Sequence, residues 1–131
     1  MESTHPVRPD LPSEGCARWG EFAGHQQFHE PVRFALDHAL AEHLQNIVHY
    51  SHATQVVLRF EVEPGCVRVT VTDDGTGFDP TQAPQVDTST PIEARPIGGL
   101  GIHMMRRLTD ELVYTRLPGM NRLEMVKKFG P

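Results

Sequence analysis

Glu42, Asn46 and His49 bring a carboxylate, an amide and an imidazole together at helical spacing. The spacing i, i+4 and i+7 places the three side chains, here called the polar stripe, within a wedge of about 60° on a helix. A carboxylate there can accept a proton one turn from an amide oxygen that can ligate a hard cation such as Mg²⁺. The same pattern is also typical of an ordinary solvated helix face, and the stripe alone does not decide between these interpretations.

Asp73 is a second candidate because it follows three valines of one strand parity, Val67, Val69 and Val71. A carboxylate on the inward face of a strand is costly unless a partner satisfies it. The alternative is that the strand has ended and Asp73 begins a turn. Gly75 and Gly77 follow at alternate positions, and glycines there permit a flat ligand to approach closely or φ to be positive.

A third candidate is the glycine-rich segment 97–102, Ile-Gly-Gly-Leu-Gly-Ile, which precedes a helical pattern. Main-chain N–H groups at such a helix start can bind an anion, and the helix dipole favours negative charge there. The alternative interpretation is a flexible hinge.

The intervening sequence predicts the elements that must position these groups. An apolar stripe shares the segment of the polar stripe and predicts a helix over residues 32–52, with the polar stripe roughly opposite it: Leu36, Leu40, Leu44 and Ile47. Further helices are predicted over 16–27 and 102–109, hairpins over 55–73 and 111–129, a long loop over 75–101, and a loose proline-rich arm over 1–15. This order predicts an α+β two-layer sandwich with helices on one face of a mixed, mostly antiparallel sheet, as a single domain over 16–131.

Composition excludes several classes of function. The chain has 131 residues and a net charge of −5, and no run of Lys and Arg exceeds two, so a nucleic acid partner is not expected. No apolar run approaches the roughly 18 residues of a membrane span, and no membrane partner is expected. Cys16 and Cys66 lack a Cys-x-x-Cys partner and fit free thiols in the cytoplasm. The eight histidines come without a His-Glu-x-x-His sequence, so a transition-metal site is not favoured.

Together and in this order, the three groups resemble the N box and the two glycine boxes of the Bergerat-fold (GHKL) ATPases. The details are most similar to the anti-sigma-factor serine-protein kinases of bacterial partner switching: Glu42-x-x-x-Asn46-x-x-His49-Tyr50, Asp73-Asp74-Gly75-Thr76-Gly77-Phe78-Asp79-Pro80, and the segments 95–103 and 121–128. No P-loop and no His-Arg-Asp or Asp-Phe-Gly motif of conventional kinases occurs.

The resemblance implies a role for each candidate residue. Glu42 would be the general base, Asn46 would hold Mg²⁺ at the ATP phosphates, and Asp73 would bind the adenine amino group. Gly75 and Gly77 would line the base, and residues 78–97 would form the ATP lid. The phosphate contacts would come from Gly98, Gly99, Leu100 and Gly101, with His49 nearby. The family commonly has a small hydroxyl residue where Glu124 stands, so the contacts on the adenine side are expected to differ.

The resemblance therefore implies an ATP- and Mg²⁺-dependent serine/threonine-protein kinase. Such a kinase phosphorylates a Ser or Thr of a small antagonist protein and sequesters a regulator, for example a sigma factor, while the antagonist is phosphorylated. The resemblance does not decide whether the chain forms a homodimer. One alternative is a non-catalytic nucleotide-binding module whose lid ATP orders for a protein partner. Another is an ATPase domain for a histidine-kinase-like relay, although no dimerisation helix pair with an acceptor histidine is evident.

Overall fold

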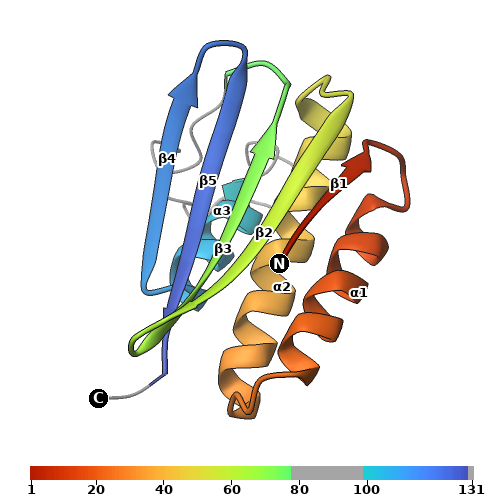
Figure 1. Ribbon diagram of the computed structural model, residues 1–131. Coiled ribbons are helices and arrows are strands. Elements are labelled where there is room, and N and C mark those ends of the chain that lie inside the picture. The colour runs from red at the N-terminus through yellow and green to blue at the C-terminus, as the bar shows by residue number, and fades with distance from the viewer. Residues whose placement is uncertain (78–98, 130–131) are drawn as a thin grey trace.

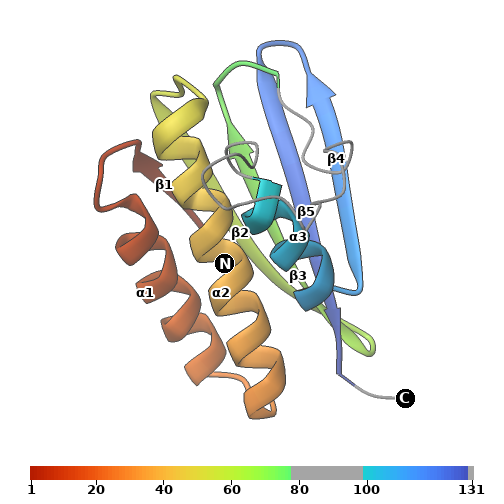
Figure 2. The ribbon, with the colours of Figure 1, turned by 180° about the vertical axis from the view of Figure 1, so that it is seen from behind.

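The computed structural model describes residues 1–77 and 99–129, which form three helices and five strands. Figures 1 and 2 show all three helices on one face of the sheet. The elements are β1 (Glu2–Pro6), α1 (Leu11–Gly24), α2 (Glu30–Tyr50), β2 (Gln55–Glu63), β3 (Cys66–Asp73), α3 (Gly99–Leu108), β4 (Glu111–Leu117) and β5 (Met120–Lys128). The predicted two-layer α+β sandwich is confirmed.

The sheet has the order β1-β2-β3-β5-β4, and every pairing in this described sheet is antiparallel rather than mixed. Strand alternation gives it one apolar face, which packs on the helices. The core between the layers is built from Leu36, Leu40, Leu44 and Ile47 of α2 and from Val56, Leu58, Phe60, Val67, Val69, Val71, Leu123 and Met125 of the sheet. The apolar stripe of α2 therefore faces the sheet, as its spacing predicts.

The N-terminal segment differs from the predicted loose arm. Residues 2–6 form β1, which pairs with β2 at the edge of the sheet. The sequence Glu-Ser-Thr-His-Pro has no apolar alternation that would predict a strand. Main-chain pairing with β2 holds this strand in place. Helix α1 also begins earlier than predicted, at Leu11, because Pro12 lies in its first turn, where proline is tolerated.

Gly15, the last residue of the segment predicted as a loose arm, has a packing role in α1. A Cβ at this position would lie 2.2 Å from Leu44 Cδ1, so the missing side chain lets α1 approach α2 closely. Trp19 and Ala23 continue the buried face of α1. In the part of the chain that the structure describes, no helix combines the length and the apolar sequence needed to cross a bilayer.

Candidate functional site

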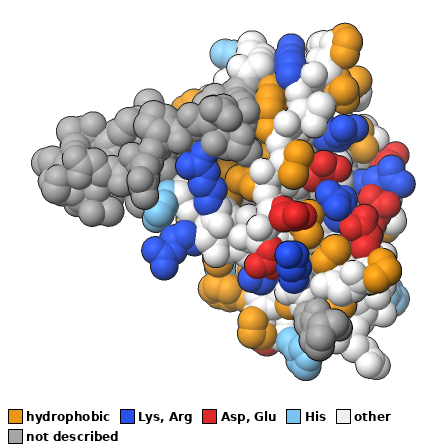
Figure 3. Space-filling view, turned by 90° about the vertical axis from the view of Figure 1, so that its left-hand side faces the viewer, with side chains coloured by type: hydrophobic (Ala, Val, Ile, Leu, Met, Phe, Trp, Pro, Cys, Tyr) orange, Lys and Arg blue, Asp and Glu red, His pale blue; other side chains and the backbone are white. Residues whose placement is uncertain are grey.

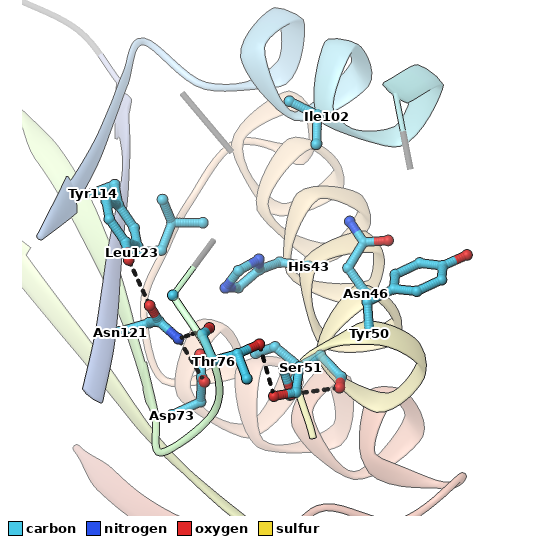
Figure 4. A pocket seen from close by; sticks show the side chains of 12 residues that line it. His43, Asn46, Tyr50, Ser51, Asp73, Thr76, Ile102, Tyr114, Asn121 and Leu123 are labelled. Carbon is cyan, nitrogen blue, oxygen red and sulfur yellow. Dashed lines mark hydrogen bonds between the residues drawn. The ribbon is translucent and has the colours of Figure 1, made fainter. Parts of the chain in front are cut away.

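A cavity of about 290 Å³ lies between α2, α3 and the end of the sheet where β3 stops (Figure 4). Its volume is near the lower end of the range for small-molecule sites, roughly 300–1,000 Å³. The described residues that line it are His43, Asn46, Ile47, Tyr50, Ser51, Asp73, Thr76, Gly77, Ile102, Tyr114, Asn121 and Leu123. Apolar and aromatic walls with a few convergent polar groups are typical of a site for a small organic ligand.

Asp73 is the last residue of β3 and points into this cavity, with only 4% of its surface exposed. Its Oδ1 accepts hydrogen bonds from the Gly75 N–H (2.8 Å) and from Asn121 Nδ2 (3.1 Å). Among the described residues, no donor contacts Oδ2. The carboxylate is therefore held through one oxygen, and the other is free to accept a hydrogen bond from a ligand.

Asn121 of β5 lies directly opposite Asp73 in the strand register and holds it in place. The Asn121 Oδ1 accepts hydrogen bonds from the Tyr114 hydroxyl (2.5 Å) and from Arg116 Nη1 (3.1 Å). Because an arginine can only donate, the amide oxygen must face Arg116, and the amide NH₂ must face Asp73 and the Thr76 carbonyl (2.8 Å). The orientation of both side chains is thus fixed before any ligand binds.

Burial raises the pKa of Asp73 above its ordinary value, and the adjacent Asp74 carboxylate adds to the increase. The hydrogen bonds from Asn121 and Gly75 oppose this change because they stabilise the ionised form. A buried carboxyl group with a perturbed pKa in a cavity is a common mark of a functional site.

Asp74 has a structural role, although it is the neighbour of Asp73. It is exposed, and its carboxylate accepts hydrogen bonds from the Thr54 N–H (2.7 Å), the Thr54 hydroxyl and the Gln55 N–H (3.1 Å). These bonds lower the pKa of Asp74, the Thr54 hydroxyl having the largest effect. Of the two consecutive aspartates, one therefore faces the cavity and the other fixes the start of β2.

Gly75 is required by a close backbone approach, and its φ is not positive. A Cβ there would lie 2.5 Å from the Ser51 carbonyl oxygen and 2.9 Å from Asp73 Oδ1. The same Ser51 carbonyl accepts a hydrogen bond from the Thr76 N–H (2.9 Å), which joins the end of α2 to the segment after β3. Gly77 lines the cavity, whereas Gly75 lies behind it.

We expect Gly75→Ala to destabilise the fold by about 1–3 kcal/mol, because the main chain of Ser51 cannot move away cheaply. Gly77→Ala is the matched control, since its Cβ would lie 3.6 Å from Arg116 Nε, an ordinary contact. Chemical denaturation of both variants measures the difference. Equal free energies of unfolding for the two variants would show that the contact with Ser51 is not what requires glycine.

The polar stripe of α2 is only partly in the cavity. Asn46 lines it together with Ile47 of the apolar stripe, so the cavity reaches the edge of the polar stripe. Glu42 lies one turn before Asn46, is half-buried, and is not among the described lining residues. His49 is exposed, and its ring packs near Tyr50 at 5.9 Å between centroids.

The described part of the glycine-rich segment, residues 99–102, forms the first turn of α3, which begins three residues before the predicted helix over 102–109. The helix begins at Gly99 and includes Leu100 and Gly101, and Ile102 of its first turn reaches the cavity. Gly98 and the predicted lid over residues 78–97 lie outside the described residues.

Several cavity residues were not predicted from the sequence, and Asn121 and His43 are the most important of them. Glu124, where a departure on the adenine side was expected, pairs with Thr70, and its carboxylate lies 3.6 Å from Arg68 on the other face of the sheet. Asn121 can be identified as a cavity residue only once the pairing of β3 with β5 is known, because that pairing places it opposite Asp73. His43 could have been found, because it is four residues before Ile47 and so lies on the buried face.

The sequence profile of the histidine kinase-like ATPase domain matches residues 6–127 of the chain. The chain is also similar to the serine/threonine-protein kinase BtrW of Bordetella bronchiseptica. The two are 29% identical over 104 residues, which cover 76% of this chain and 73% of BtrW.

Solved structures share the fold at low sequence identity. The RsbU and RsbW domains of Rv1364c from Mycobacterium tuberculosis match with a TM-score of 0.69 and 16% identity over 98% of this chain, which spans 32% of that chain. The SiaB–SiaC complex of Pseudomonas aeruginosa matches with a TM-score of 0.60 and 16% identity, over 97% of this chain and 88% of that one.

Proposed function

Since the chain belongs to the histidine kinase-like ATPase domain family, we propose that it is an ATP-dependent serine/threonine-protein kinase and partner-binding switch. It transfers phosphate to a Ser or Thr of a small antagonist protein, and it sequesters a regulator such as a sigma factor while that antagonist is phosphorylated. The observation that carries the proposal is the cavity itself, which Asp73 enters from the sheet and Asn46 enters from α2.

In this proposal, Asp73 Oδ2 accepts a hydrogen bond from the adenine amino group. Its other oxygen is already occupied by Gly75 and Asn121, so one acceptor faces the ligand. Gly77 borders the base, with Gly75 behind it, and main-chain N–H groups of residues 99–101, at the start of α3, would contact the phosphates.

Mg²⁺ fits the donor set of the site. The half-buried Asn46 offers a hard amide oxygen to the cavity, and Mg²⁺ prefers such oxygen ligands together with phosphate oxygens and waters. When bound, the cation would neutralise phosphate charge during transfer.

Glu42 would act as the general base that accepts the proton of the attacking hydroxyl, one helical turn from Asn46. Its position outside the described cavity wall leaves it available to a protein substrate. His49 is exposed on the same helix and would contact a phosphate.

The proposed protein partners follow from the relatives. BtrW is a serine/threonine-protein kinase, and SiaB was solved in complex with SiaC. For this chain, the corresponding partner would be a small antagonist protein with an acceptor Ser or Thr. Two free thiols, Cys16 and Cys66, agree with a reducing compartment such as the cytoplasm.

The test is a transfer assay with the purified chain, labelled ATP, Mg²⁺ and candidate small antagonist proteins. We expect label on a Ser or Thr of one antagonist, and binding of that antagonist that differs with its phosphorylation. ATP binding without transfer to any antagonist would contradict the kinase and favour the non-catalytic module. A chain that binds no adenine nucleotide would contradict both.

A further inference from the structure

His43 places an imidazole inside the cavity, although none of the roles described above uses it. It lies on the sheet-facing side of α2 and is 8% exposed. Figure 4 shows its ring extending from α2 into the cavity, toward the side of Leu123 and Asn121. Its Nε2 is buried and has no hydrogen-bond partner among the described residues.

A buried nitrogen without a partner is unfavourable, because it has lost its hydrogen bonds to water and gained none in the protein. Most buried polar atoms in folded proteins are paired, so an unpaired one that faces a ligand cavity points to a bond made with the ligand. The cavity that His43 enters is also lined by Ile47, Ile102 and Leu123, and an apolar side chain in place of His43 would not carry this penalty. A histidine here therefore has a use that packing does not explain.

Burial lowers the pKa of His43 to about 4, so its ring is neutral near pH 7. A neutral imidazole carries one N–H donor and one acceptor nitrogen. Asp73, when ionised, can only accept. The cavity can thus present an acceptor from β3 and an N–H donor from α2 to the same ligand.

Adenine matches this pair of groups. On its Watson–Crick edge, the amino group donates and the adjacent ring nitrogen N1 accepts. Guanine presents a carbonyl oxygen and an N1–H on the same edge, which is the reverse pattern. A carboxylate alone can accept a hydrogen bond from the amino group, and the N–H donor would donate one to the neighbouring N1.

We propose that His43 is a second base-reading residue, whose Nε2–H donates to adenine N1, directly or through one bridging water, while Asp73 accepts from the amino group. The inference rests on the proposed function, since it assumes that an adenine nucleotide occupies the cavity. It adds a specificity-determining residue from α2 to the contact that Asp73 makes.

The test compares the binding of ADP and 1-deaza-ADP, in which a C–H replaces N1. We expect the unaltered chain to bind ADP about 10-fold more tightly, the effect of one hydrogen bond at a buried group. His43→Leu should bind the two nucleotides equally, and His43→Gln, which keeps a donor, should restore part of the preference. His38→Leu is the matched control, because His38 is exposed on the same helix, and it should keep the full preference.

The outcomes separate this inference from the proposed function. If the unaltered chain binds both nucleotides equally, or if both His43 variants keep the full preference, His43 does not read N1, whereas binding of ADP upholds the nucleotide site. If the unaltered chain binds no adenine nucleotide, the proposed function fails and the inference fails with it. Melting temperatures of the variants confirm that each compared chain is folded.

Discussion

Asp73→Asn is expected to weaken adenine nucleotide binding by at least about 100-fold, or about 3 kcal/mol, while the fold stays intact. Two donors, the Gly75 N–H and Asn121 Nδ2, face Asp73 Oδ1. In the variant, the amide oxygen must take this position, because an NH₂ group there would face two donors. The new NH₂ then replaces the acceptor Oδ2 and faces the donating amino group of the base.

The stability of the ligand-free variant should change in the opposite direction. Burial raises the pKa of Asp73, so its ionised form is disfavoured in the folded chain. The stability that this group contributes is present below its unfolded-state pKa and is lost as pH rises through the raised folded-state pKa. Asparagine does not ionise, so Asp73→Asn lacks this loss of stability at rising pH. We expect the variant to gain stability relative to the unaltered chain as pH rises from acid toward neutral.

Asp74→Asn provides the matched control for this experiment. Asp74 bonds Thr54 and Gln55 through an exposed carboxylate, and its pKa is lowered. Its contribution to stability is present above the unfolded-state pKa and is lost as pH falls through the folded-state pKa. We expect a lower melting temperature near neutral pH with unchanged nucleotide affinity. Nucleotide titration and melting curves over pH measure both effects, and a loss of affinity in Asp74→Asn alone would reverse the assignment of the two aspartates.

The contrast between these aspartates also shows how far the sequence could predict the site. The alternation of Val67, Val69 and Val71 placed Asp73 on the inward face, and its burial confirms this. Alternation is a local property, so it is read from a single segment. The partner of Asp73 could not be found in this way, because Asn121 is 48 residues away and meets it only through the pairing of β3 with β5.

The difference between local alternation and long-range strand pairing also explains why the prediction of a loose arm over residues 1–15 was wrong. The main-chain hydrogen bonds of β1 to β2 leave no pattern in the sequence Glu-Ser-Thr-His-Pro, and prolines nearby favoured a loop. Helix α2, in contrast, has an apolar stripe long enough to predict both its position and its buried side. An element whose apolar side chains recur at a regular spacing, such as α2, was predicted from the sequence. The strand β1, which is held by long-range main-chain pairing, was not.

Glu42→Gln should separate chemistry from binding. We expect phosphate transfer to the antagonist to fall by at least about 100-fold, the usual contribution of a general base. Glu42 is not among the described residues that line the cavity, and the groups proposed to contact the base are Asp73 on the sheet and His43, which lines the cavity. Nucleotide affinity should therefore change by less than about 2-fold, because the glutamine keeps the size of the side chain and makes no base contact.

Glu30→Gln is the control for this prediction, because it makes the same substitution at an exposed position in the first turn of α2. Single-turnover transfer and equilibrium nucleotide binding should both remain close to those of the unaltered chain. Transfer that persists in Glu42→Gln would show that another group accepts the proton. If Glu42→Gln loses affinity as strongly as Asp73→Asn, Glu42 belongs to the nucleotide-binding site, and the separation of phosphate transfer from nucleotide binding does not hold.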